Sequence, residues 1–179
     1  DATGRFLKRS DLAMHLDSGA KKVFTTRNPE EKIDRYVIPG INDSYIDSSD
    51  RIISTTSSTT QVLALMLKML DESFGLERAM MTTIHAYTAD QPLADAAGLD
   101  LRRSRSAVEN IIPNSTFAPS IVEEIMPKFK GKIDGIAFNV PVPNGSCVDL
   151  TTELRKTPTA EEANHAIKKF SENSLKNIV

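Results

Sequence analysis

The spacing of hydrophobic residues divides the chain into short helices and strands. Between residues 58 and 73, apolar side chains occupy nearly every face of a predicted helix, which Gly75 ends. A helix of this kind is expected to be buried on most sides. Another helix is predicted from about residue 160, because Thr159 and Glu162 have the spacing of a capping box. Its expected buried stripe consists of Ala163, Ala166, Ile167 and Phe170.

Strand-like patterns alternate irregularly with these helices. In the segment 146–155, Val148, Leu150, Thr152 and Leu154 are expected on one face, and Cys147, Asp149, Thr151 and Glu153 on the other. The order of elements lacks strict strand–helix alternation and therefore favours an α+β fold, with one mainly antiparallel mixed sheet and helices packed on one face. The other predicted elements are helices at 10–17 and 118–127 and strands at 21–26, 35–41, 52–53, 76–87 and 133–143.

A long stretch from Thr88 to about Thr116 has no regular pattern. It carries three arginines, Arg102, Arg103 and Arg105. Loops of this length inside a compact domain are usually functional or lie in an interface. The first two arginines are expected in solvent or in a subunit contact.

A cluster of hydroxyl residues precedes the long buried helix. Residues 54–59 read Ser-Thr-Thr-Ser-Ser-Thr. A helix N-terminus has unpaired backbone N–H groups and a partial positive charge, so these side chains could cap the helix, hold an anion or supply an activated nucleophile. The pattern alone leaves all three possibilities open.

Composition narrows the function classes. The 179 residues include 22 Lys plus Arg and 24 Asp plus Glu, for a net charge of −2, which predicts no general attraction to nucleic acid or to anionic membranes. No apolar run reaches the roughly 20 residues of a membrane helix, and we expect a cytoplasmic protein. With one cysteine and three scattered histidines, neither a disulfide nor a metal site is expected.

Several motifs, in the same order and at the same spacing, resemble the phosphorylating glyceraldehyde-3-phosphate dehydrogenase family. The resemblance covers nearly the whole chain, and the coincidence of several motifs is much more specific than any one of them. The motifs are GAKKV (19–23), SSTT (57–60), MTTIHAYTADQ (81–91), DLRRSRSAVENIIPNST (100–116), VPVPN (140–144) and VDLT (148–151).

The resemblance implies a catalytic site at the start of the buried helix. The family's nucleophile is a cysteine at the position of Ser58, and its base is a histidine at the position of His85. Matching positions further imply contacts to substrate or phosphate from Ser57, Thr59, Thr88, Arg105 and Thr116.

The resemblance also implies a division of the chain. Residues 1–53 correspond to the end of the dinucleotide-binding domain and the entry into the catalytic domain, and residues 54–179 to a catalytic-domain core truncated at its C-terminus. Thr3 lies in a turn that closes the first domain and is the candidate cofactor contact. NAD or NADP is implied for the intact parent, whereas no cofactor is expected for this chain alone. A homo-oligomer is implied for the intact protein, because the long loop packs at the centre of a tetramer in this family.

Three positions depart from the family pattern in one pocket. Ser58 replaces the nucleophilic cysteine, Phe117 replaces a glycine and should crowd the pocket, and Asn139 replaces an arginine that grips substrate phosphates. We therefore expect an ancestral oxidation of a phosphorylated aldehyde that is impaired or lost here. The alternative is a non-catalytic homologue that serves as a binding or assembly module. A Ser58–His85 hydrolase dyad lacks an identifiable orienting acid.

The remaining reactive side chains have structural interpretations. Cys147 is expected to be a buried structural thiol rather than a substitute nucleophile. His15 and His165 lie on predicted amphipathic helices and are expected to face solvent.

Overall fold

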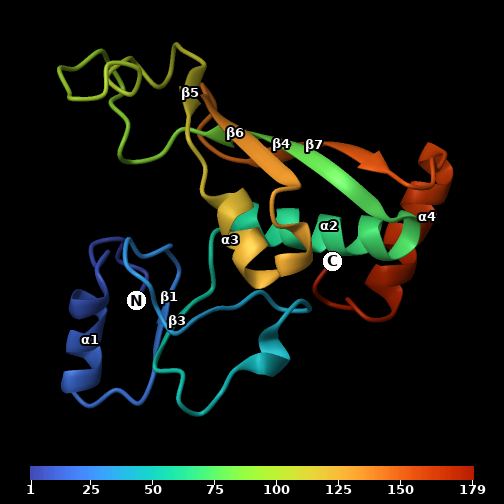
Figure 1. The fold of residues 1–179 in the computed structure, drawn as a ribbon. Coiled ribbons are helices and arrows are strands. Elements are labelled where there is room, and N and C mark those ends of the chain that lie inside the picture. Colours follow the sequence, from blue (N-terminus) through green and yellow to red (C-terminus); the bar gives the residue numbers. More distant parts are fainter.

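The computed structural model describes residues 1–179 and contains two sheets of different construction (Figure 1). The smaller sheet is parallel, with the strand order β1-β3-β2. Helix α1 (Arg9–Asp17) packs against it, and the buried side chain of Leu12 meets Val23, Ile33 and Ile52. The strands are β1 (Val23–Thr25), β2 (Arg35–Tyr36) and β3 (Ile52–Ser54).

The larger sheet is mixed and mainly antiparallel, as predicted. Its strand order is β5-β6-β4-β7, and only the central β4–β6 pair is parallel. Together with the helices, it confirms the predicted α+β class. The strands are β4 (Leu76–Ala86), β5 (Ile112–Asn114), β6 (Ile133–Val140) and β7 (Ser146–Leu154).

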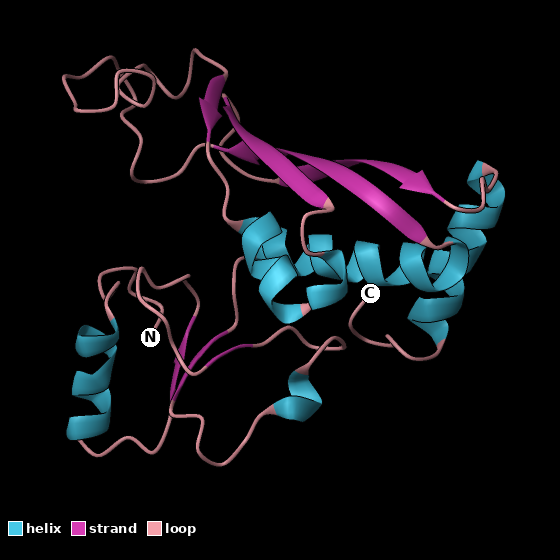
Figure 2. Ribbon diagram, in the orientation of Figure 1, coloured by secondary structure: helices cyan, strands magenta, loops and turns pink.

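Helices α2 (Ser58–Phe74) and α3 (Ala118–Ile125) cover one face of the larger sheet (Figure 2). The main core lies between them and the sheet and includes Leu63, Leu67, Met81, Val122 and Phe129. Helix α4 (Ala160–Glu172) lies at the far end of the sheet, near the C-terminus of α2. Two 3₁₀ turns, η1 (Asp43–Tyr45) and η2 (Pro127–Phe129), complete the structure.

The capping box of α4 is present as predicted, but its apolar stripe is only half-buried. Helix α2 is also less enclosed than expected, because the side chain of Val62 is exposed. No helix of the protein is both long and apolar enough to cross a membrane.

Two predictions fail along the larger sheet. Strand β5 lies inside the stretch that was predicted to be irregular, since pairing with β6 makes a strand of three residues that carry no pattern of their own. Cys147 is exposed rather than buried. It lies on the polar side of β7, whose predicted alternation the structure confirms.

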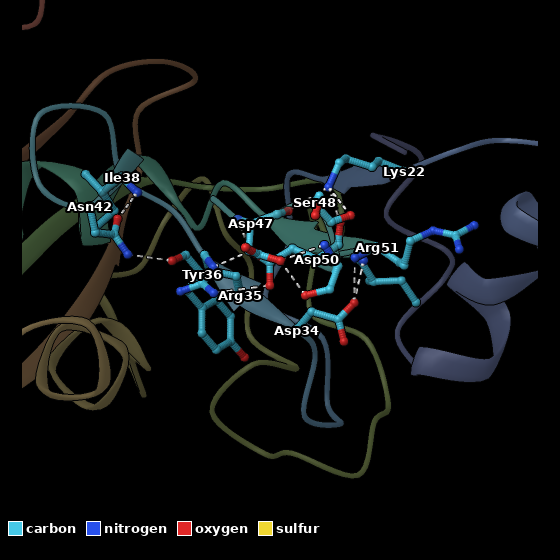
Figure 3. A network of polar contacts seen from close by, with 12 residues as sticks. Lys22, Asp34, Arg35, Tyr36, Ile38, Asn42, Asp47, Ser48, Asp50 and Arg51 are labelled. Atoms are coloured by element: carbon cyan, nitrogen blue, oxygen red, sulfur yellow. Dashed lines mark hydrogen bonds and ion pairs between the residues drawn. The ribbon is translucent and has the colours of Figure 1, made fainter. Parts of the chain in front are cut away.

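A network of polar contacts fixes the start of β3 (Figure 3). Asp34 accepts the backbone N–H groups of Arg51 and Ile52, both at 2.8 Å. Burial alone would raise the pKa of Asp34, but these bonds and the Arg9 guanidinium lower it below its usual value. Nearby, Arg35 pairs with the buried Asp50 and lowers the pKa of that carboxyl. The network therefore anchors the strand that leads into the hydroxyl cluster.

Candidate functional site at the N-terminus of helix α2

Ser57 is the N-cap of α2. Its hydroxyl accepts the backbone N–H of Thr60 at 3.2 Å and lies 2.8 Å from the Thr60 hydroxyl. This contact satisfies one of the unpaired donors at the start of the helix. Ser57 therefore has the capping role among the possibilities that its sequence pattern left open.

The residue before the cap has an unusual backbone. Thr56 has a φ of 63° and is buried, although a β-branched residue rarely adopts the left-handed region. Two contacts hold this turn. The Ser54 hydroxyl accepts the Thr56 N–H at 3.0 Å, and the Gln61 side chain donates to the Thr55 carbonyl at 2.7 Å. The helix entry is thus held in one conformation from both the strand and the helix.

Ser58 and Thr59 begin the first turn of α2. The Ser58 side chain is exposed and that of Thr59 is half-buried, and neither makes a hydrogen bond within the chain. Both hydroxyls are therefore free to meet a ligand at a helix terminus, where backbone N–H groups and the helix dipole favour anions.

The connection between α2 and β4 returns the chain to this terminus. Gly75 ends α2 with a φ of 74°, and Asp71 accepts the N–H of Leu76 at 2.9 Å just beyond the turn. Strand β4 then packs back along α2 (Figure 1). A helix of 17 residues spans about 25 Å, and the ten residues from Leu76 to His85 span about 30 Å. His85 thus lies toward the same end of the layers as Ser58.

The His85 ring is tied to the backbone. Its Nδ1 lies 2.7 Å from the carbonyl oxygen of Ala86. Because a carbonyl oxygen can only accept, Nδ1 carries the proton, and Nε2 of the neutral ring is left as an acceptor. This is the tautomer in which Nε2 can accept a proton. The structure contains no hydrogen bond between His85 and Ser58.

Asn139 lies beside His85 in the neighbouring strand. The register pairs the two residues across β4 and β6. Asn139 is 7% exposed, and its side-chain nitrogen donates to the same Ala86 carbonyl at 3.2 Å. Its side-chain oxygen accepts from the Asn114 amide at 3.1 Å. Both ends of the Asn139 amide are therefore occupied by the protein.

Thr116 and Phe117 lie at the start of α3. The Thr116 hydroxyl accepts the N–H of Ala118 at 3.2 Å, in the turn just before this helix. The Phe117 side chain is 70% exposed and lies at the surface. The expected crowding of the pocket by Phe117 is therefore not seen in this conformation.

Thr88 and Arg105 lie in the long loop and have partners there. The Thr88 hydroxyl donates to Asp90, and Arg105 pairs with Asp95 at 3.2 Å. Burial raises the pKa of Asp90, but Thr88 and Arg103 outweigh it, so the carboxyl is more acidic than usual. No contact joins Thr88 or Arg105 to the α2 terminus, so the structure does not bring all the predicted site residues together.

The chain contains neither a glycine loop of the phosphate-binding kind nor a cluster of potential metal ligands. The hydroxyl of Thr3 donates to the Asp1 carboxylate. None of the eight glycines belongs to a Gly-x-Gly-x-x-Gly loop that opens a helix, the usual cradle for a pyrophosphate. No group of three or more His, Cys, Asp or Glu side chains is placed to hold a metal ion.

Sequence reasoning missed three residues that support the site. Ser54 and Gln61 hold the entry of α2, and Asn114 completes the contact to Asn139. Ser54 was recognised only as part of the hydroxyl cluster. Asn114 could not be recognised without strand β5, because its role depends on the pairing of β5 with β6.

Comparisons with known proteins agree with this arrangement of elements and motifs. The family described as "Glyceraldehyde 3-phosphate dehydrogenase, C-terminal domain" matches residues 57–179. The "Glyceraldehyde-3-phosphate dehydrogenase" of Geobacillus stearothermophilus is 47% identical over 180 residues, which cover 100% of this chain and 53% of that protein. The protein of the same name from Mycobacterium avium is 47% identical, and 52% of its length is covered. "Glyceraldehyde-3-phosphate dehydrogenase 1" of Bacillus subtilis (strain 168) is 46% identical, with 53% covered.

The chain therefore spans about half the length of the curated relatives that it matches. The family match covers well over half of the 179 residues, and the relatives align with the whole chain. This chain belongs to the glyceraldehyde-3-phosphate dehydrogenase family.

Proposed function

We propose that this chain is a glyceraldehyde-3-phosphate dehydrogenase-like catalytic region that has lost the dehydrogenase reaction and retains a weak site for phosphate groups. The observation that carries the proposal is Ser58, an exposed alcohol at the helix terminus where the family has its nucleophilic cysteine.

The replacement of sulfur by oxygen has a direct chemical consequence. A thiol with an ordinary pKa of about 8.5 becomes a thiolate beside a histidine and a helix N-terminus. A serine hydroxyl without a strong base stays protonated, so it is a poor nucleophile toward an aldehyde. A covalent adduct at Ser58 is therefore expected to form too slowly to support hydride transfer, and we expect a loss of several orders of magnitude in rate.

The surroundings of His85 support the loss of a contact to the substrate phosphate. Asn139 uses both ends of its amide within the protein, so it does not replace the phosphate contact of an arginine. Residual anion binding has its own support, from the free hydroxyls of Ser58 and Thr59 at the N-terminus of α2.

The substrate follows from the names of the relatives, and the cofactor from the family that the sequence motifs resemble. The ancestral substrate is a phosphorylated aldehyde, with NAD or NADP as the oxidant in the intact parent. When bound, NAD or NADP would supply the hydride acceptor. The residues of this chain would hold the phosphate at the α2 terminus and accept a proton at His85 Nε2.

The proposal is tested by mixing the chain with glyceraldehyde 3-phosphate, inorganic phosphate and either NAD or NADP. We expect no reduction of either nucleotide above a control without protein. Turnover well above that control would overturn the proposed loss of activity. In a separate titration, inorganic phosphate should shift the backbone amide resonances of Ser58–Thr60. If the phosphate titration leaves those resonances unmoved, the retained anion site is wrong.

A second experiment asks whether the scaffold is a dormant enzyme. Ser58→Cys, Asn139→Arg and Phe117→Gly are combined in a chain extended to the full length of the relatives. Phosphate-dependent reduction of NAD would indicate a scaffold that still supports the chemistry, whereas its absence would favour a repurposed binding module.

An assembly role is the second candidate, and the long loop favours it. Its apolar side chains Leu93, Leu99, Leu101 and Ile111 are all exposed. Beneath it, a cavity of about 820 Å³ is bounded by Leu99, Leu101, Pro113 and Phe138. Exposed apolar groups of this extent are typical of protein contacts. We expect a homo-oligomer for the intact protein, and sedimentation of Leu99→Ser with Leu101→Ser should show a smaller species than the unmodified protein.

A further inference from the structure

We propose that Asn139 is a positioning residue that, together with Asn114, links the loop at residues 115–117 to the imidazole of His85. In this arrangement Asn139 fixes the carbonyl that holds His85 with its proton on Nδ1. The inference rests on the proposed function only for the role of the free Nε2. Its structural content stands on four hydrogen bonds made by the side chains of three neighbouring strands.

The donor and acceptor in each of these hydrogen bonds can be assigned, starting from the Ala86 carbonyl. The Ala86 carbonyl can only accept, so the Asn139 atom that faces it, at 3.2 Å, is the amide nitrogen. The oxygen of Asn139 then faces Asn114 and requires a donor, which is the Asn114 amide nitrogen at 3.1 Å. The remaining oxygen of Asn114 accepts the backbone N–H of Ser115 at 2.9 Å. Every member thus has a single consistent orientation.

Burial makes this arrangement costly to break. Asn139 is 7% exposed, and its contact with Ala86 is buried. A buried amide left without a partner destabilises the folded protein, because its hydrogen bonds to water are lost and not replaced. Loss of the Asn114 donor would therefore leave the side-chain oxygen of Asn139 without a partner.

The chain of contacts ends at His85. The Ala86 carbonyl accepts from both Asn139 and His85 Nδ1, the latter at 2.7 Å. Asn139 fixes the direction of this carbonyl, so the imidazole meets an acceptor whose position does not vary. At the other end, Ser115 precedes Thr116, the candidate phosphate contact. A shift of the loop on binding an anion would be carried through Asn114 and Asn139 to the histidine.

The replacement of the family's arginine therefore has a structural meaning. An arginine at position 139 has no acceptor and could not accept the Asn114 amide. Asparagine both donates and accepts, so it joins the two strands on either side of β6. At position 139, a charged side chain that would contact the substrate is thus replaced by a neutral one that positions His85.

The test is the tautomer of His85, read from the ring ¹⁵N chemical shifts of the full chain. The measurement is made at about pH 9, well above the ordinary histidine pKa of about 6.5. In the unmodified protein we expect a protonated Nδ1 and an unprotonated Nε2. A His85 ring with its proton on Nε2, the form that free imidazole side chains prefer, would overturn the inference without any variant.

Two variants separate positioning from packing. Asn139→Leu keeps approximately the volume and removes both functions, and Asn139→Asp keeps the acceptor and removes the donor. In both, the His85 shifts should move toward the average of exchanging tautomers, while those of the exposed His165 stay unchanged. Unaltered His85 shifts in a folded variant would refute the role of Asn139. If neither variant folds, Asn114→Ala in β5 provides the same comparison from the other end.

The same spectra keep this inference apart from the proposed function. Inorganic phosphate is added to the unmodified protein, and the amides of Thr116 and Ser58 are followed. Movement of these amides tests anion binding, whereas the tautomer without phosphate tests Asn139. A failure of the phosphate titration would not affect the conclusion on Asn139, and an unexpected tautomer would not affect the conclusion on anion binding.

Discussion

The hydroxyl of Ser57 accepts the backbone N–H of Thr60, whereas the hydroxyl of the adjacent Ser58 makes no contact within the chain. Two neighbouring serines at one helix terminus thus have different roles. Ser57 belongs to the structure of α2, and Ser58 is available to a ligand.

We expect Ser57→Ala to lower the free energy of unfolding by about 1 kcal/mol, because it removes the N-cap contact of α2. Ser58→Ala should change it by less than about 0.5 kcal/mol, as for most exposed substitutions. Urea denaturation of the two variants measures both values. Equal losses would mean that the capping contact does not distinguish the two serines.

Substitution of Gly75 tests the turn that returns β4 along α2. Its φ of 74° is costly for other residues, so Gly75→Ala should destabilise the protein by about 1–2 kcal/mol. Gly131 is the matched control, since it has a φ of 73° and open space around the position of a Cβ atom. A Cβ at Gly75 would lie 3.0 Å from the Arg155 side chain. Any excess cost over Gly131→Ala should therefore shrink in the Arg155→Ala background, where only the Cβ of residue 155, at 3.3 Å, remains close.

The strained backbone of Thr56 gives a prediction of unusual sign. Replacing a buried threonine by glycine normally costs stability through lost packing and greater freedom of the unfolded chain. At Thr56, with a φ of 63°, relief of strain worth about 1–2 kcal/mol offsets much of that loss. Thr25 is equally buried and lies in strand β1. Thermal denaturation should show Thr56→Gly to be less harmful than Thr25→Gly by about 1 kcal/mol or more, and the reverse order would exclude strain at residue 56.

The lowered pKa of Asp34 predicts the direction of one pH effect. In the folded protein this carboxyl titrates below its ordinary value of 3.8, so the unfolded chain binds the proton more readily. The contribution of Asp34 to stability is complete above that ordinary value and is lost as the pH falls through the lower, folded value. Urea midpoints between about pH 6 and pH 3 should fall less steeply for Asp34→Asn than for the unmodified protein. Parallel curves would contradict the role of this carboxylate.

Much of the fold could be predicted from patterns among residues that are close in sequence. The capping box of Thr159 and Glu162, the apolar run of α2 and the alternation of β7 each depend on residues close in sequence, and all three elements form as predicted. The pairing of strands across the sheet could not be predicted from the sequence in the same way. Strand β5 has three residues and exists because β6 lies beside it. The alternation of β7 itself places Cys147 on the polar face, and that local pattern was a better guide than the usual burial of cysteine.

The candidate site likewise contains residues that could be predicted from the sequence and residues that could not. The positions of Ser58 and His85 followed from motifs that resemble a known family, and Ser57 had the ordinary chemistry of a helix cap. The contacts of Asn114 with Asn139, and of Asn139 with Ala86, depend on the register of three strands. No local pattern reports such a register, so these supporting residues could be found only in the folded chain.

The parallel pairing of β4 with β6 has a consequence for how the domain folds. The contact between Asn139 and the Ala86 carbonyl joins residues 53 positions apart, with the long loop, β5 and α3 between them. Helix α2 and β4 are adjacent in sequence and can associate early, but a contact across so long a segment requires that segment to be closed first. We therefore expect the surroundings of His85 to be completed late in folding, after α2 and β4 have associated.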